Sequence, residues 1–198
     1  MSDHDHGESH DHGGSEGDGH EHSHGHDSGD DEGHQHSHLE LDTVSFAVVT
    51  VSSSRTLEND PGGDRLEELI EAGGHEVAVR ELVGDEREAI AATVEALVER
   101  SDVEAVVLTG GTGLSPEDVT VEAVRPLFDQ EIPGFGELFR MLSYEDIGPR
   151  ALLSRAFAGS KDGVAVFCLP GSEQGAAFGT EELVLPTVAH VLGHTQGE

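Results

Sequence analysis

A glycine-rich segment follows a short apolar run near the middle of the chain. Residues 106–108 are apolar and lead into Thr109-Gly110-Gly111-Thr112-Gly113. Glycine adopts backbone conformations that other residues avoid, and it lets a ligand approach the chain closely. Where such a loop leaves a parallel β-strand, its backbone N–H groups can bind phosphate. The segment therefore predicts a phosphate-binding loop, with a plain tight turn as the alternative.

Two aspartates could add a metal ion to this phosphate site. Asp118 follows the glycine loop, and Asp85 follows another expected strand. Mg²⁺ in proteins usually takes one or two carboxylates together with phosphate oxygens and water. The alternative for both residues is helix capping, with Asp85 as an N-cap and Asp118 as a first-turn acid. We expect the two carboxylates to share Mg²⁺ if their loops meet.

Strands and helices alternate along residues 39–198. The hydrophobic patterns predict strands over residues 46–51, 75–83, 103–108 and 164–169, with helices over 63–73, around 90–98, 119–128, 135–143 and 151–158, and a last helical segment from 173 that is interrupted at Pro186. Because most of these strands are nearly all apolar, they favour a parallel sheet that is covered on both faces. We therefore expect an α/β fold, a three-layer α/β/α sandwich with a mostly parallel central sheet.

In a parallel sheet, the loops that follow the strands meet at one edge. Those loops are residues 52–60, 84–85, 110–118 and 170–172. This arrangement places the glycine loop, Asp85 and Asp118 around a single crevice.

Residues 1–38 differ in composition from the rest of the chain. They contain 11 histidines and 11 acidic residues, with no lysine or arginine. Such a segment cannot bury enough apolar surface to fold, so we expect a disordered tail ahead of a domain over residues 39–198. Closely spaced imidazoles and carboxylates suit Zn²⁺, Ni²⁺ or Cu²⁺. A solvated spacer is the alternative. The candidate tail ligands are His20, His22, His24, His26, His34, His36 and His38.

Acidic residues also dominate the remaining 160 positions. Removing the 11 tail acids from 41 leaves 30 acids against 10 bases, and Lys161 is the only lysine. This balance indicates a high-salt cytoplasm and a haloarchaeal source. Full folding and activity in salt-free buffer would contradict that hypothesis. No basic stripe suggests a nucleic-acid partner.

The chain has no apolar stretch that resembles a signal peptide or a membrane span, so we expect a soluble cytoplasmic protein. Cys168 is the only cysteine and lies within the apolar run 164–169. It cannot form a disulfide within the chain, and we expect it to be a buried core thiol.

The segment Thr109–Gly113 with Asp118-Val-Thr120 resembles the MogA/MoaB family of molybdenum-cofactor biosynthesis. The resemblance covers roughly residues 42–193. The run 135–143 and the Pro-Gly-Ser segment are more similar to the MoaB branch of the family than to the MogA branch. Further matching segments are Thr50-Val-Ser52, Asp60, Gly73-Gly-His75, Gly134-Phe-Gly-Glu137, Leu138-Phe-Arg140, Leu142-Ser143, Ile147-Gly148, Leu153-Ser-Arg155 and Leu169-Pro-Gly-Ser172.

The resemblance implies a molybdopterin adenylyltransferase. In that reaction the terminal phosphate of molybdopterin attacks the α-phosphorus of ATP, and pyrophosphate leaves. Asp85 and Asp118 match the two essential acidic positions of the family and would hold Mg²⁺. The implied substrate and nucleotide contacts are Thr109, Gly110, Gly111, Thr112, Gly113, Ser52, Ser154, Arg155, Pro170, Gly171 and Ser172. For Arg155, a surface ion pair is the alternative.

The resemblance further implies a homo-oligomer, either a trimer or a hexamer, and a downstream metal-insertion protein as a partner. Some members of the MoaB branch lack one key acid and look catalytically silent, whereas this chain keeps both. Three positions depart from the family pattern: Ser54, Glu117 and the Glu173-Gln174 pair. The alternative function is therefore a silent molybdopterin-binding scaffold or carrier.

Overall fold

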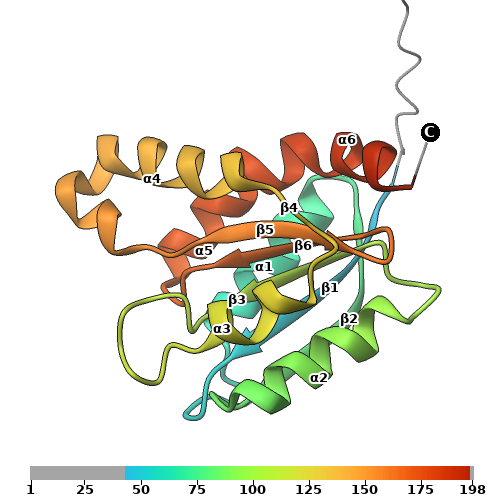
Figure 1. Ribbon diagram of the computed structural model, residues 1–198, viewed down its shortest axis with the longest axis horizontal. Helices are drawn as coiled ribbons and strands as arrows, with labels where there is room; N and C mark the ends of the chain where they lie inside the picture. The colour runs from blue at the N-terminus through green and yellow to red at the C-terminus, as the bar shows by residue number, and fades with distance from the viewer. Residues whose placement is uncertain (1–42, 197–198) are drawn as a thin grey trace, which may run out of the picture. The chain divides into compact units, whose positions relative to one another are not determined.

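The computed structural model describes residues 43–196. The predictions for residues 1–38, the disordered tail with its candidate metal ligands, lie outside the described residues. The described part forms a six-stranded sheet in the order β2-β1-β3-β6-β5-β4 (Figure 1). Its strands are β1 (Ser45–Val51), β2 (Glu76–Val83), β3 (Ala105–Thr109), β4 (Gln130–Glu131), β5 (Phe157–Lys161) and β6 (Val164–Leu169).

Helices connect and cover these strands. The α-helices are α1 (Pro61–Ala72), α2 (Arg87–Val98), α3 (Thr120–Val124), α4 (Pro133–Ile147), α5 (Glu173–Gly179) and α6 (Leu185–Thr195). Short 3₁₀ segments follow α3 at Arg125–Leu127 (η1) and α4 at Gly148–Leu153 (η2), and a π-helical turn at Thr180–Val184 (η3) joins α5 to α6. Pro186 lies in the first turn of α6, which confirms the predicted restart there.

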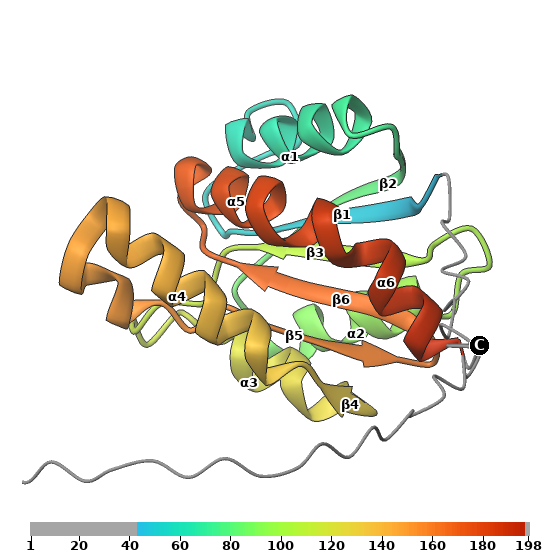
Figure 2. The same ribbon diagram turned by 90° about the horizontal axis from the view of Figure 1, so that it is seen from above.

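The two faces of the sheet carry separate apolar cores. Phe46 and Val48 of β1 face one core, which they share with α1, α4, α5 and α6. Ala47 and Val49, the alternate residues of β1, face the other core with α2 and α3. Figure 2 shows α1, α5 and α6 side by side on one face. These layers confirm the predicted α/β/α sandwich.

The parallel part of the sheet aligns the strand ends on which the site depends. β1, β2, β3 and β6 are mutually parallel, and Thr109 lies opposite both Thr50 and Leu169. The loops that follow these strands therefore leave the same edge of the sheet. β5 runs antiparallel to β6, so the residues that precede β5 reach that same edge.

The prediction of a helix over residues 151–158 is wrong. The structure has η2 up to Leu153 and the strand β5 from Phe157, and the predicted strands also omitted β4. β5 has the sequence Phe-Ala-Gly-Ser-Lys, which contains little of the apolar or β-branched content that marks a strand. Gly159 is needed there because a Cβ would overlap the ring of Phe128. Tertiary packing thus determines this strand.

The predicted helix over 119–128 is shorter in the structure, because α3 ends at Val124 and gives way to η1 around Pro126. Cys168 is fully buried as predicted, and burial raises the pKa of its thiol well above the ordinary value. None of the helices within residues 43–196 has the length and apolar character that crossing a bilayer requires.

Candidate functional site

Four loops form a cavity at the carboxyl edge of the parallel strands. Its volume is about 250 Å³, and we call it the acid cavity because Asp85 and Asp118 both line it. The loops after β1, β2, β3 and β6 each contribute to it, as expected for loops that leave the same edge of a parallel sheet. The other lining residues are Val51, Ser52, Ser54, Arg55, Thr109, Gly110, Gly111, Ser115, Glu117 and Gly171.

Asp85 is held by the loop that follows β1. The backbone N–H of Ser53 donates to Asp85 Oδ2 at 2.9 Å, and the backbone N–H of Asp85 donates to Ser53 Oγ at 3.1 Å. Helix α2 begins at Arg87 and has no side-chain cap, so the N-cap alternative for Asp85 is wrong. The paired hydrogen bonds join the ends of β1 and β2 and fix the direction of the carboxylate.

For the Mg²⁺ site predicted at Asp85, we expect Ser53→Ala to weaken binding about fivefold, because the substitution removes one hydrogen bond worth about 1 kcal/mol. The Mg²⁺ concentration that gives half-maximal binding, measured by calorimetry, checks this. Ser101→Ala is the matched control, since Ser101 is exposed in the turn before β3, at the opposite edge. Equal Mg²⁺ affinity in both variants would show that Ser53 does not position Asp85.

Asp118 stabilises the end of the glycine loop. Its Oδ2 accepts a 2.7 Å hydrogen bond from the backbone N–H of Ser115, and its own N–H donates to Ser115 O at 2.9 Å. Helix α3 begins two residues later without a side-chain cap, so Asp118 is not a first-turn capping acid. In the part of the chain that the structure describes, Oδ1 of Asp118 and Oδ1 of Asp85 take no hydrogen bond.

The glycine loop has the backbone conformation that its sequence predicted. Gly110 has a φ of +113° and Gly111 a φ of +66°, both in the region that favours glycine. A Cβ on Gly110 would overlap Val51 O, and one on Gly111 would overlap Thr120 Oγ1. Thr120 Oγ1 in turn donates to Gly110 O at 2.8 Å. The glycines therefore allow close packing of this loop against β1 and α3.

A second, larger cavity adjoins the acid cavity. It has a volume of about 370 Å³, and we call it the apolar cavity because Phe139, Ile147, Leu153 and Phe178 form much of its wall. Asp118 and Gly171 line both cavities. The predicted contacts Thr112, Gly113, Ser154, Pro170 and Ser172 also line it, together with Ser143, Asp146, Ala151, Gln174 and Gly175.

Thr109 and Ser172, both predicted contacts, have structural partners. The hydroxyl of Thr109 donates to Pro170 O at 2.8 Å and joins the ends of β3 and β6. Ser172 is the N-cap of α5 and accepts a hydrogen bond from the N–H of Gly175. Both residues therefore shape the loops that surround the cavities.

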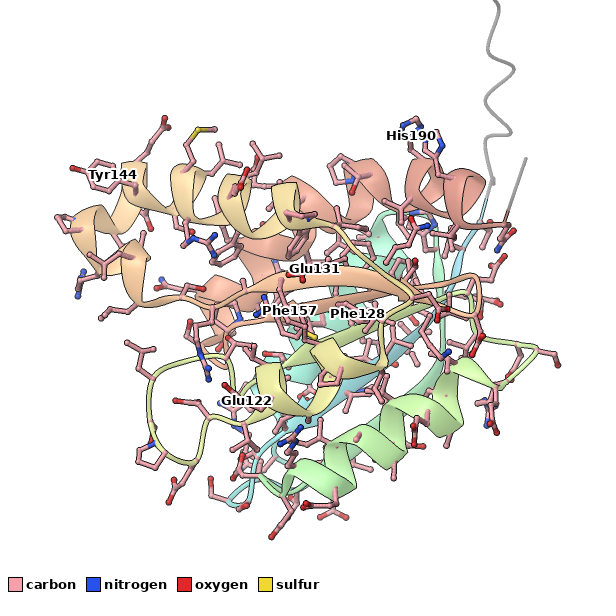
Figure 3. The ribbon with its side chains drawn as sticks, viewed as in Figure 1. Glu122, Phe128, Glu131, Tyr144, Phe157 and His190 are labelled. Atoms are coloured by element: carbon pink, nitrogen blue, oxygen red, sulfur yellow. The ribbon has the colours of Figure 1, made fainter. Side chains whose placement is uncertain are left out.

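Arg155 lies outside both cavities. Its guanidinium donates to Gly113 O at 2.8 Å, to Asp118 O at 2.7 Å and to the carboxylate of Glu122. Figure 3 shows Glu122 on α3, next to the glycine loop. Arg155 thus forms an ion pair with Glu122, which was the alternative to a substrate contact, and it also anchors the glycine loop. Its predicted contact with a substrate stays a prediction.

The sequence reasoning assigned no role to the buried carboxylate of Asp60. Asp60 Oδ2 accepts from the Thr50 hydroxyl and from Arg80 at 3.1 Å, while Oδ1 accepts from Gly63 N–H at 3.2 Å and from Arg55 at 3.3 Å. Burial alone would raise the pKa of Asp60. The hydrogen bonds from Thr50 and Gly63 and the positive charge of Arg80 outweigh burial and hold the pKa below its ordinary 3.8.

Arg55 is the one basic residue among those that line the acid cavity, and the sequence reasoning also missed it. Its guanidinium is partly buried and pairs with Asp60. The sequence did contain an indication of its role, because Arg55 is the single basic residue in the loop 52–60. Through Asp60, the cavity is coupled to the start of α1.

The two carboxylates fit a hard divalent cation. Asp85 and Asp118 each keep one oxygen without a hydrogen bond, and Mg²⁺ binds oxygen ligands from one or two carboxylates. Within the described ranges, no group of three histidine, cysteine or acidic side chains is placed to hold a metal ion.

An α/β sandwich that carries a glycine loop, two carboxylates and an adjoining apolar cavity at the carboxyl ends of its parallel strands has the architecture of α/β domains that bind ligands at that edge of the sheet. Residues 47–190 match the family described as "Probable molybdopterin binding domain". The chain belongs to this family and, within it, to the MogA/MoaB group of molybdenum-cofactor biosynthesis proteins.

Relatives agree with this assignment. The chain is 46% identical over 152 residues to "Molybdenum cofactor biosynthesis protein B" of Bacillus subtilis strain 168, which covers 76% of this chain and 89% of that protein. It is similar to a solved structure titled "Crystal structure of Molybdenum cofactor biosynthesis protein B", with a TM-score of 0.77 and 43% identity over 79% of this chain and 98% of that one. The structure of the Mog protein from Mycobacterium ulcerans is similar to this chain with a TM-score of 0.69 and 26% identity, over 77% of this chain and 99% of that one. These identities favour the MoaB branch.

Proposed function

We propose that the protein acts in molybdenum-cofactor biosynthesis as an ATP- and Mg²⁺-dependent molybdopterin adenylyltransferase. The observation that carries the proposal is the shared boundary of the two cavities, where Asp118 and Gly171 line both. A pterin in the apolar cavity and a nucleotide phosphate in the acid cavity would meet at this boundary. Family membership and the names of the relatives support the substrate class.

The apolar cavity suits the flat pterin ring system. Phe139 and Phe178, whose ring centroids lie 6.0 Å apart, contribute aromatic surface. Ser143, Asp146 and Gln174 add polar groups that can hydrogen-bond to the edge of a pterin. These walls would exclude water from the reacting phosphate and fix its orientation.

The acid cavity suits the polyphosphate. The N–H of Gly110 already donates to Leu169 O, so the remaining N–H groups of the glycine loop and the guanidinium of Arg55 are the donors that can reach phosphate oxygens. Asp85 and Asp118 would hold Mg²⁺, which neutralises phosphate charge and aligns the reactants when it is bound. The pterin phosphate would form a bond to the α-phosphorus of ATP, and the bond from that phosphorus to pyrophosphate would break.

We further propose that the protein is a homo-oligomer. Six of the eight large apolar side chains that are exposed among the described residues lie on α4 or η2: Leu138, Met141, Tyr144, Ile147, Leu152 and Leu153. Tyr144 points away from the sheet in Figure 3. Such a concentration of apolar surface is typical of a subunit contact. A monomeric mass in sedimentation equilibrium would contradict this proposal.

The experiment that tests the proposed activity mixes the protein with molybdopterin, ATP and Mg²⁺ in high salt and measures the release of pyrophosphate. We expect release only when all three are present. If molybdopterin binds and no pyrophosphate forms, the protein is a molybdopterin-binding scaffold or carrier.

A further inference from the structure

Two histidines lie one turn apart on the exposed side of α6. The Nε2 atoms of His190 and His194 are 3.2 Å apart, and their ring centroids are 4.5 Å apart. Figure 3 shows His190 on the side of α6 that faces away from the sheet. Val188 and Leu192 on the opposite side of the helix are fully buried, so packing fixes the direction of the histidine pair.

The spacing of the two nitrogens suits a shared metal ion. Two imidazole nitrogens at about 2.0–2.1 Å from a tetrahedral metal lie roughly 3.3 Å from each other. We propose that His190 and His194 chelate a late first-row divalent cation, namely Zn²⁺, Ni²⁺ or Cu²⁺. The same distance also allows a hydrogen bond between the two rings, and the experiment below separates these explanations.

The ligand chemistry sets the selectivity of the pair. Imidazole favours Zn²⁺, Ni²⁺ and Cu²⁺, whereas Mg²⁺ prefers oxygen ligands. In residues 43–196, no third histidine, cysteine or acidic side chain joins the pair.

The histidine pair is separate from the acid cavity. Thr195, next to His194, donates a hydrogen bond from its hydroxyl to Gly163 O in the turn between β5 and β6. That turn lies at the opposite edge of the sheet from the loops that hold Asp85 and Asp118. Cation binding at α6 therefore does not depend on the proposed adenylyl transfer.

Hydrogen exchange of the full chain, read by mass spectrometry of its peptides, tests the proposal. A cation that bridges the two rings stabilises the last turns of α6. At a free Zn²⁺ concentration ten times the dissociation constant, exchange that requires opening of these turns slows about tenfold. Because each peptide reports its own segment, cation binding by the other histidines of the chain does not obscure the result.

The variants His190→Gln and His194→Gln each leave one imidazole on the helix, and exchange in the core strands without metal verifies that both fold. We expect Zn²⁺ to slow exchange in α6 of the wild-type protein and to leave the exchange rate of α6 unchanged in both variants. Mg²⁺ should not change the exchange rate of α6 in any of the three proteins. Unchanged exchange in wild-type α6 at saturating Zn²⁺ would overturn the proposal and favour the hydrogen bond between the rings as the reason for their approach. Equal protection in wild type and variants would also overturn it.

Discussion

Replacing Asp118 by asparagine is expected to lower the rate of adenylyl transfer at least about 100-fold while molybdopterin still binds. Asparagine keeps the shape of the side chain and an oxygen that can accept the N–H of Ser115. It removes the charge that would hold Mg²⁺, and metal stabilisation of phosphate charge is worth several kcal/mol. Single-turnover rates and molybdopterin titrations of both proteins measure the two effects separately.

Glu117→Gln is the matched control for Asp118→Asn. Glu117 is adjacent in sequence and lines the same cavity, so the substitution removes an equal charge from nearly the same place. We expect it to keep the wild-type rate within about twofold, because exposed charges that hold no ligand have small effects. Equal losses in the two variants would indicate a general effect of charge and would remove Asp118 from the mechanism.

Replacing Asp60 by asparagine is expected to lower the free energy of unfolding by about 3 kcal/mol, because it removes the charge of a buried carboxylate that accepts hydrogen bonds from two arginines. Asp60 is buried and accepts hydrogen bonds from Arg80 and Thr50. The amide group of asparagine would place donors against these donors. Urea unfolding of both proteins in high salt measures the difference.

Asp64→Asn serves as the control for Asp60→Asn, since Asp64 pairs with the same Arg80 at 2.6 Å but is half exposed. We expect a loss below about 1 kcal/mol for this exposed pair. A loss as large as that of Asp60→Asn would show that burial does not determine the effect.

The effect of Asp60 should also depend on pH. Because its pKa in the folded state lies below the ordinary 3.8, ionised Asp60 stabilises the fold fully above pH 3.8. This stabilisation is lost as the pH falls through the folded-state pKa. The stability difference between wild type and Asp60→Asn should therefore be constant near neutral pH and decline below pH 3.8.

Much of the fold could be predicted from local sequence patterns. β1, β3 and β6 are buried and mostly apolar, and the glycines that follow β3 predicted a loop whose backbone has positive φ. The parallel order of these strands then placed Asp85 and Asp118 at one cavity. These features depend on short segments whose chemistry is evident without their tertiary neighbours.

Features that depend on distant contacts were harder to predict. β5 is a strand because it pairs with β6 and packs under Phe128, although most of its own residues do not favour a strand. Arg155 anchors the glycine loop through carbonyl oxygens more than 35 positions away in sequence, at Gly113 and Asp118. The hydrogen bonds of Asp60 likewise join β1, β2 and α1. The sequence around Asp60 does not indicate that its carboxylate is buried.

The destination of the α-phosphorus of ATP tests the central claim most directly. Protein, molybdopterin and Mg²⁺ are incubated with ATP that carries a radioactive label on the α-phosphorus, and the products are separated. The proposed function predicts that the label appears on the pterin while pyrophosphate leaves unlabelled. Bound pterin without label, with all of the label still in ATP, would contradict adenylyl transfer.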